Sequence, residues 1–204
     1  MALTALVLAC TLRPSPAESS SVLLGQQVLD ALAEHAVSGE LVRVVDHTVR
    51  FGVSTDEGEG DEWPSIREKM LAADILLIAT PIWMGQPSSV AKMALERLDA
   101  EISETDDAGR MSTYPKVAVM AVVGNEDGAH HSVAEISQAL NDTGFTLPAN
   151  AATYWVGEAM GSTDYNDLDE TPEKTASTTK MLAANAAHLA RVLRENPYPG
   201  VEED

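Results

Sequence analysis

Short apolar runs alternate with amphipathic helical segments along this chain, and this alternation limits what it can fold into. The runs predicted as strands are 3–9, 41–46, 74–80, 116–123 and 152–156. Helices are predicted from Ser20 or Ser21, from Trp63 through Leu71, from Ser88 or Ser89 through Ile102, around Val133, Ile136 and Leu140 up to Gly144, and over 173–194. Strands that alternate with helices in this way form a parallel sheet covered on both faces.

The handedness of these connections places the loops. Because strand-helix-strand crossovers are right-handed, every loop that leads from a strand into a helix lies at the carboxyl edge of the sheet. We expect a three-layer α/β/α sandwich with a five-stranded parallel sheet in the order 2-1-3-4-5, in which a ligand docks between strands one and three. Residues 1–204 are expected to form one domain with a frayed tail at 197–204.

The charge balance excludes some partners. The chain carries 13 Lys and Arg residues against 32 Asp and Glu residues, which gives a formal net charge of −19. Phosphate backbones and anionic membrane surfaces are bound by clustered basic residues, so we expect neither a nucleic acid nor a membrane as partner. No apolar run approaches the ~20 residues that cross a bilayer.

Cys10 is the only cysteine, so a disulfide within the chain and a cysteine-rich metal site are both excluded. The cytoplasm is the expected compartment. The alternative is a short secretory signal that ends at Cys10. It is weakly supported, because no Lys or Arg precedes the apolar run and the run has only about eight residues.

The loop after the first strand, 11–21, gathers hydroxyl groups at the start of a helix. It reads Thr-Leu-Arg-Pro-Ser-Pro-Ala-Glu-Ser-Ser-Ser. Backbone N–H groups, a helix dipole and short hydroxyls bind phosphate, and Arg13 can hold two phosphate oxygens. Because the glycine patterns of triphosphate and dinucleotide sites are absent, the loop predicts a phosphate monoester site. The alternative is that Ser19 to Ser21 only cap the helix.

The loop after the third strand carries an aromatic ring at a turn. The apolar run 75–79 leads into Thr-Pro-Ile-Trp-Met-Gly at 80–85. One hypothesis places a flat ring system on Trp83, or edged by Ile82 and Met84. The other packs Trp83 against the neighbouring loop. Gly85 permits a backbone path that brings N–H groups near a ligand.

The loop after the fourth strand, 124–131, reads Gly-Asn-Glu-Asp-Gly-Ala-His-His. Loops of this composition carry function more often than stability. Adjacent histidines rarely face one ion and no His-Glu-x-x-His spacing is present, so we expect no metal site. His130 is a candidate for substrate contact. Surface or helix-capping roles are the alternative for Glu126, Asp127 and His131.

With these three loops on one edge, the chain resembles the flavodoxin-like family of NAD(P)H-dependent FMN reductases and quinone reductases over about residues 3–195. The resemblance rests on Thr11-x-Arg13 with Ser19-Ser20-Ser21, on Thr80-Pro81-Ile82-Trp83-Met84-Gly85 with Ser88 and Lys92, and on Gly124-Asn125. It implies a flavodoxin-like fold, FMN as cofactor, and NADPH or NADH as reductant.

The resemblance also implies the site residues. The FMN phosphate would be held by Thr11, Arg13, Ser19, Ser20 and Ser21. The isoalloxazine ring would be lined by Pro81, Ile82, Trp83, Met84 and Gly85, and its other edge approached by Gly124, Asn125, Glu126 and Gly128. No side chain is expected to act as a catalytic acid or base in the first half of the reaction.

The implied reaction is hydride transfer from a nicotinamide to the flavin, and then from the flavin to a quinone, a free flavin, or a nitro or azo compound. A homodimer or homotetramer is implied as well. One alternative is an electron carrier of the flavodoxin kind without its own NAD(P)H activity, which fits the acidic charge. Another is a flavin-free structural or regulatory protein. The acidic loop 157–171 is expected either to cap the site, which we favour, or to bridge to the last helix.

Overall fold

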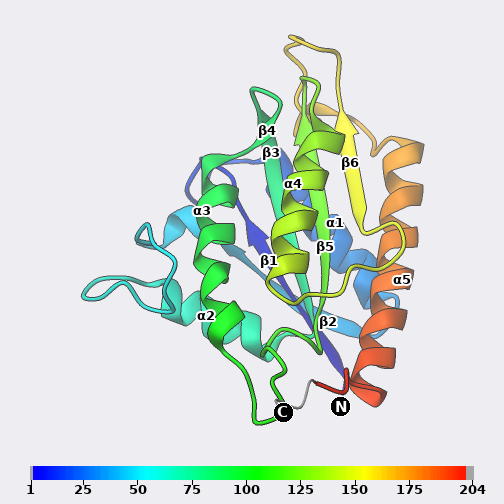
Figure 1. Cartoon of the computed structure of the whole chain (residues 1–204). Helices are drawn as coiled ribbons and strands as arrows, with labels where there is room; N and C mark the ends of the chain where they lie inside the picture. The colour runs from blue at the N-terminus through cyan, green and yellow to red at the C-terminus, as the bar shows by residue number, and fades with distance from the viewer. Residues whose placement is uncertain (1, 201–204) are drawn as a thin grey trace.

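A computed structural model describes residues 2–200 as one parallel sheet with helices on both faces. The parallel strands are β1 (Leu3–Ala9), β2 (Val37–Arg43), β3 (Ile75–Trp83), β5 (Val117–Gly124) and β6 (Ala152–Val156). Their order is β2-β1-β3-β5-β6, so the predicted order 2-1-3-4-5 is confirmed (Figure 1). A two-residue strand that was not predicted, β4 (Gln86–Pro87), pairs antiparallel with the end of β3.

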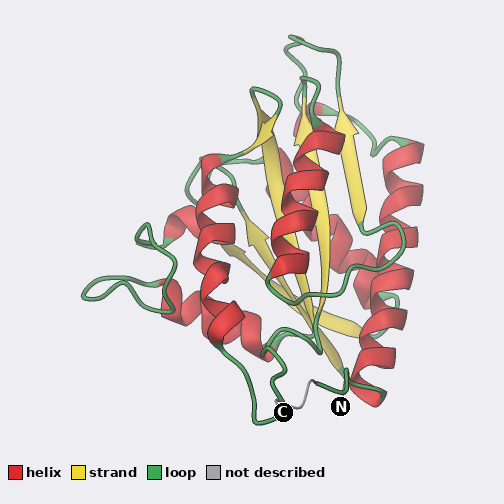
Figure 2. Ribbon diagram, in the orientation of Figure 1, coloured by secondary structure: helices red, strands yellow, loops and turns green. Residues whose placement is uncertain are grey.

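Helices cover the two faces of the sheet in separate groups (Figure 2). The helices are α1 (Ser20–Ala33), α2 (Trp63–Ala72), α3 (Ser89–Leu98), α4 (Ala129–Asp142) and α5 (Glu173–Glu195). α1 and α5 pack on one face, and α2, α3 and α4 pack on the other. Because side chains alternate along a strand, β1 sends Ala5 and Val7 to the first face and Leu6 and Leu8 to the second.

Predicted boundaries were wrong in the second strand and in the third helix. The second strand occupies Val37–Arg43 instead of 41–46, because its backbone pairs with β1 from Leu3 to Ala9. It is an edge strand with a mostly exposed or half-buried pattern, so apolar content does not mark it. Ile102 was expected on the buried stripe of the third helix but is 41% exposed. The α-helix ends at Leu98, and a 3₁₀ turn over Asp99–Ser103 changes the direction of the side chains.

The structure describes only the first part of the predicted frayed tail. Residues 201–204 of the predicted frayed tail lie outside the described residues. Before them, the Tyr198 hydroxyl is hydrogen-bonded to Thr146 at 2.9 Å, and its ring stands edge-on to Tyr114. This part of the tail is therefore held against the domain.

A buried ion pair fixes the long loop between β2 and α2. Arg97 Nη1 on α3 lies 2.8 Å from Asp61 Oδ2, and both side chains are fully buried. Arg97 also donates to the carbonyls of Arg50 and Ser54 at 2.8 and 2.9 Å. Burial alone would raise the pKa of Asp61, but hydrogen bonds from Arg97 and from backbone N–H groups lower it to about 2. Asp61 is therefore ionised at neutral pH.

We predict that Arg97→Met will lower the free energy of unfolding by about 3–5 kcal/mol, because it leaves the Asp61 carboxylate buried and charged without its cation. Urea denaturation at pH 7 measures the change. The matched control is Arg110→Met, which removes the more exposed ion pair with Asp106 and should cost at most about 1 kcal/mol. Similar losses in the two variants would contradict the prediction.

Candidate functional site

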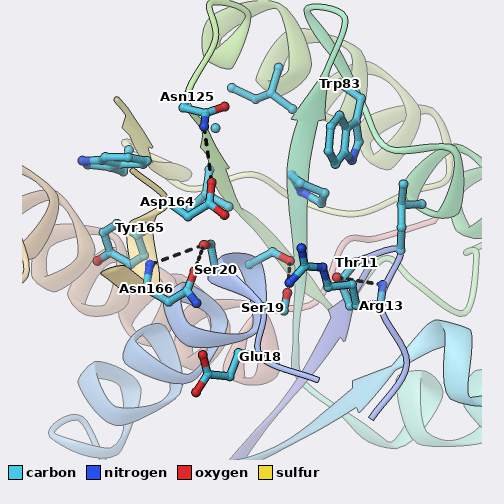
Figure 3. A pocket seen from close by; sticks show the side chains of 17 residues that line it. Thr11, Arg13, Glu18, Ser19, Ser20, Trp83, Asn125, Asp164, Tyr165 and Asn166 are labelled. Atoms are coloured by element: carbon cyan, nitrogen blue, oxygen red, sulfur yellow. Dashed lines mark hydrogen bonds between the residues drawn. The ribbon is translucent and has the colours of Figure 1, made fainter. Parts of the chain in front are cut away.

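A cleft of about 180 Å³ opens at the carboxyl edge of the sheet, at the predicted position beside the ends of β1 and β3 (Figure 3). The loops after β1, β3, β5 and β6 supply its walls. The lining residues are Thr11, Leu12, Arg13, Glu18, Ser19, Ser20, Ser21, Pro81, Ile82, Trp83, Val123, Gly124, Asn125, Trp155, Asp164, Tyr165 and Asn166. Its lining combines polar and charged side chains with aromatic ones.

The polar part of the lining is built at the start of α1. Ser19 is the N-cap residue, and its hydroxyl accepts the N–H of Val22 at 3.5 Å and lies 3.1 Å from the Ser21 hydroxyl. The first N–H groups of a helix have no partner within it, and they carry the positive end of its dipole. Among the described residues, the Arg13 guanidinium has no hydrogen bond or ion pair, and it extends beside Ser19 (Figure 3). This part of the cleft suits an anion.

The end of β2 holds the first loop in this shape. Arg43 Nη1 donates to the carbonyl oxygens of Arg13 and Ala17 at 3.1 and 2.7 Å. The Asp46 carboxylate accepts the backbone N–H and the hydroxyl of Ser15 at 2.7 and 2.5 Å. The hydrogen bonds from Ser15 lower the pKa of Asp46. Two carbonyl groups of the loop are thus paired with a cation on β2.

Aromatic side chains line the cleft from the ends of β3 and β6. β3 continues past its predicted end at Thr80 to Trp83, where it turns into β4. Ile82 is buried, whereas Trp83 is 53% exposed. The Trp155 ring from β6 packs against the Tyr165 ring, with ring centroids 5.5 Å apart. The exposed Trp83 ring favours the hypothesis of a flat ligand over the hypothesis of packing on a neighbouring loop.

The loop after β5 holds its neighbours in place. Gly124 is required here because a Cβ atom would lie 2.9 Å from Cβ of Ile82. Asn125 Nδ2 donates to the carbonyl of Gly161 at 2.9 Å, and Glu126 Oε1 accepts the N–H of Met84 at 2.9 Å. These two side chains bind protein groups from the loops on either side.

The structure brings most of the predicted site residues to the cleft. Those that line it are Thr11, Arg13, Ser19, Ser20, Ser21, Pro81, Ile82, Trp83, Gly124 and Asn125; those that do not are Met84, Gly85, Glu126 and Gly128. The turn at Gly85 and the loop at Gly128 pack backbone to backbone, which uses them as a contact between loops. The Ser20 hydroxyl is also engaged, because it donates to Asn166 Oδ1 and accepts the Asn166 N–H.

Sequence reasoning missed several lining residues. They are Leu12, Glu18, Val123, Trp155, Asp164, Tyr165 and Asn166. Three of them belong to the loop 157–171, which forms one wall of the cleft. The Tyr165 hydroxyl donates to Gln27 Oε1 of α1 at 2.6 Å, so this wall is attached to the helix that supplies the polar part of the lining. The length and acidity of the loop gave a signal, but no local pattern identified the residues that face the cleft.

Other groups take different roles. Cys10 is buried at the end of β1, and burial raises the pKa of its thiol to about 12, so it is a poor nucleophile. His130 is not among the lining residues, and its Nε2 atom lies 2.9 Å from the Tyr154 hydroxyl. Within residues 2–200 no cluster of three or more His, Cys, Asp or Glu side chains could hold a metal ion. Over the same residues no helix is long and apolar enough to cross a membrane.

The strand order and the cleft beside the ends of β1 and β3 define an α/β protein of the flavodoxin-like type. The model of the NADPH-dependent FMN reductase family matches residues 3–161. The chain belongs to this family, and it is a flavin-dependent oxidoreductase.

Individual relatives agree with this assignment. The 8-demethyl-8-aminoriboflavin-5'-phosphate synthase of Streptomyces davaonensis is 36% identical over 210 residues, which cover 97% of this chain and 81% of that protein. The crystal structure of RosB with bound intermediate 8-demethyl-8-formylriboflavin-5'-phosphate has a TM-score of 0.88 at 36% identity, covering 97% of this chain and 82% of that one. An archaeal flavodoxin has a TM-score of 0.59 at 9% identity, covers 93% of this chain and 99% of its own, and shares the fold.

We predict that Gly128→Ala will loosen the contact between the two loops and lower the free energy of unfolding. Gly128 has a φ of 127°, and an added Cβ would lie 2.6 Å from Cα of Gly85. The matched control is Gly58→Ala, where φ is 93° and nothing lies within 4 Å. Gly58→Ala should lower the free energy of unfolding by about 1–2 kcal/mol through backbone strain alone. Gly128→Ala should lower it by a further ~1–3 kcal/mol because of the clash. Thermal and urea unfolding measure both, and equal losses would contradict the prediction.

Proposed function

We propose that the chain binds FMN in this cleft and passes a hydride from NADPH or NADH through the flavin to a quinone, a flavin or a similar small acceptor. The observation that carries the proposal is that the lining of the cleft combines hydroxyls and the Arg13 cation with the exposed Trp83 ring. FMN requires both kinds of group, because it has a phosphate monoester at one end and a flat ring system at the other. Membership of the FMN reductase family supports the proposal.

The residues present fit this cofactor. The Arg13 guanidinium has no hydrogen bond or ion pair within residues 2–200 and can bind two phosphate oxygens, and the hydroxyls of Ser19 and Ser21 add donors beside the N-terminus of α1. Pro81, Ile82 and Trp83 supply an apolar part of the lining. Bound FMN would supply the redox chemistry, and the protein would position it and exclude water from one side.

The oligomeric state and the cellular compartment are two further proposals. A homodimer or homotetramer follows from the resemblance, and light scattering on the purified protein would measure it. The cytoplasm is supported by a single cysteine that is buried as a free thiol.

The visible absorption spectrum of the purified protein tests the central proposal. We expect added FMN to give the spectrum of a bound flavin, and NADPH or NADH to bleach it under anaerobic conditions. A bound flavin that neither nicotinamide bleaches would favour an electron carrier of the flavodoxin kind. No binding of FMN would overturn the proposal.

A second candidate function treats the flavin as substrate. It is favoured by the 36% identity to a protein named as an aminoriboflavin phosphate synthase and by the formylriboflavin phosphate intermediate bound in RosB. Mass spectrometry of the flavin recovered after turnover separates the two. FMN of unchanged mass supports a coenzyme role, whereas a product modified on the ring supports a synthase.

We predict that Arg13→Ala and Arg43→Ala will each weaken FMN binding by about tenfold or more, since a hydrogen bond to a charged group contributes about 1.5–3 kcal/mol. Arg13 would lose its contact with the phosphate. Arg43 would release the carbonyls of Arg13 and Ala17 that it now holds. Riboflavin has no phosphate, so its affinity should change by less than about twofold.

Fluorescence titration with each flavin measures these affinities. The control is Arg110→Ala, whose side chain pairs with Asp106 and does not line the cleft. If either variant at Arg13 or Arg43 weakens riboflavin as much as FMN, its role is general stability and not phosphate binding.

A further inference from the structure

Gln27 lies outside the cleft but holds the loop that forms one of its walls. It is a half-buried residue in the middle of α1. Its Oε1 atom accepts a hydrogen bond from the Tyr165 hydroxyl at 2.6 Å, and its Nε2 atom donates to the Thr171 hydroxyl at 2.9 Å. One carboxamide therefore ties two points of the loop 157–171 to the helix. Tyr165 lines the cleft, whereas Gln27 and Thr171 do not.

The Tyr165 ring connects Gln27 to the aromatic lining of the cleft. Tyr165 is 2% exposed and belongs to the core under α1 and α5. Its ring packs against Trp155, with the two ring planes inclined by 47°. An added Cβ at Gly157 would lie 2.5 Å from Trp155 Cη2, so the backbone of Gly157 also approaches the indole. The position of the Trp155 ring is therefore set by two neighbours, and Gln27 holds one of them.

Trp155 and Trp83 lie on the same face of the sheet, on either side of β5. Trp155 and Val123 of β5 pack with the side chains under α1 and α5. Ile82 packs against α4 on the opposite face, so Trp83, the next residue of β3, points to the face of Trp155. β3 and β6 are two strands apart, about 10 Å. A flat ring that contacts a Trp on each side needs about 7–8 Å. Figure 3 shows Trp83 and Tyr165 on opposite sides of the cleft.

We propose that Gln27 is a positioning residue for the ring of the flavin. By holding Tyr165, it fixes Trp155 at the place where the ring packs. The inference rests on the proposed function, and it applies equally to a flavin that serves as coenzyme and to one that serves as substrate. Loss of the Gln27 hydrogen bonds should weaken every ligand that carries the ring, whereas loss of the Arg13 cation should weaken FMN.

The test measures the binding of FMN, riboflavin and lumiflavin by fluorescence titration. Lumiflavin has the ring without the ribityl chain and the phosphate, so it reports on the ring alone. Gln27→Met removes both hydrogen bonds at nearly constant side-chain size. We expect it to weaken the binding of all three flavins by about threefold to tenfold, which is the effect of one lost hydrogen bond between neutral groups. Urea denaturation identifies conditions in which each variant is fully folded.

Gln26→Met is the matched control. Gln26 is the neighbouring glutamine of α1, it is exposed, and its Nε2 atom donates to Asp30 of the same helix at 2.9 Å. This variant should bind the three flavins as the wild type does. Gln27→Glu keeps an acceptor for the hydroxyls of Tyr165 and Thr171. It should therefore bind lumiflavin within about twofold of the wild type, because lumiflavin is uncharged and does not respond strongly to the added carboxylate.

A double-mutant cycle tests whether Gln27 acts through Tyr165. Tyr165→Phe removes the hydroxyl and keeps the ring that packs against Trp155. We expect Tyr165→Phe to weaken lumiflavin binding, and the double variant to bind lumiflavin no more weakly than Gln27→Met alone, because both substitutions break the same hydrogen bond. Tyr165→Phe also keeps the inference testable where Gln27→Met does not fold.

Three outcomes would overturn the inference. Wild-type affinity for lumiflavin in folded Gln27→Met would leave Gln27 with a role in stability alone. A loss confined to FMN would place its effect at the phosphate. Fully additive losses in the double variant would show that Gln27 does not act through Tyr165. Failure of the proposed function is distinguishable, because the wild-type protein would then bind none of the flavins, and the inference would fall with it.

Discussion

The pairing of β1 with a parallel neighbour on each side determines the rest of the structure. β2 pairs along one edge of β1 and β3 along the other. The chain leaves β1 through α1 on one face of the sheet and leaves β3 through α3 on the opposite face. The two loops therefore separate at the carboxyl edge, and a cleft opens between them. The residues that line the cleft lie on the loops and strand ends at this edge.

The sequence predicts those parts of the structure that depend on local pattern. Continuous apolar runs marked the central strands β1, β3 and β5, which are covered on both faces. The edge strand β2 lacks such a run, and its boundary was wrong. The third helix kept its apolar spacing past Leu98, but a 3₁₀ turn follows there and exposes Ile102. The spacing of apolar residues does not show where the backbone changes from an α-helix to a 3₁₀ turn.

The candidate site was predictable where hydroxyls, a cation or an aromatic ring follow a strand directly. Thr11, Arg13, Ser19 and Trp83 were found in this way and line the cleft. The wall at Asp164, Tyr165 and Asn166 was not, because the contact between Ser20 and Asn166 joins residues 146 positions apart. Glu126 and Gly128 were assigned to the cofactor by the family resemblance. They serve contacts between loops, which single-sequence reasoning does not distinguish from contacts with a ligand.

The loop between Gly124 and Gly128 has a consequence for how such a protein changes over evolution. It contacts the turn after β3 through Glu126 and Gly128, and the segment after β6 through Asn125. An insertion or deletion of one residue in it would displace both neighbours together, whereas the strands beneath would keep their register. The loops at the entrance of the cleft would therefore move together. A change of length in this loop would thus reshape the entrance without disturbing the sheet.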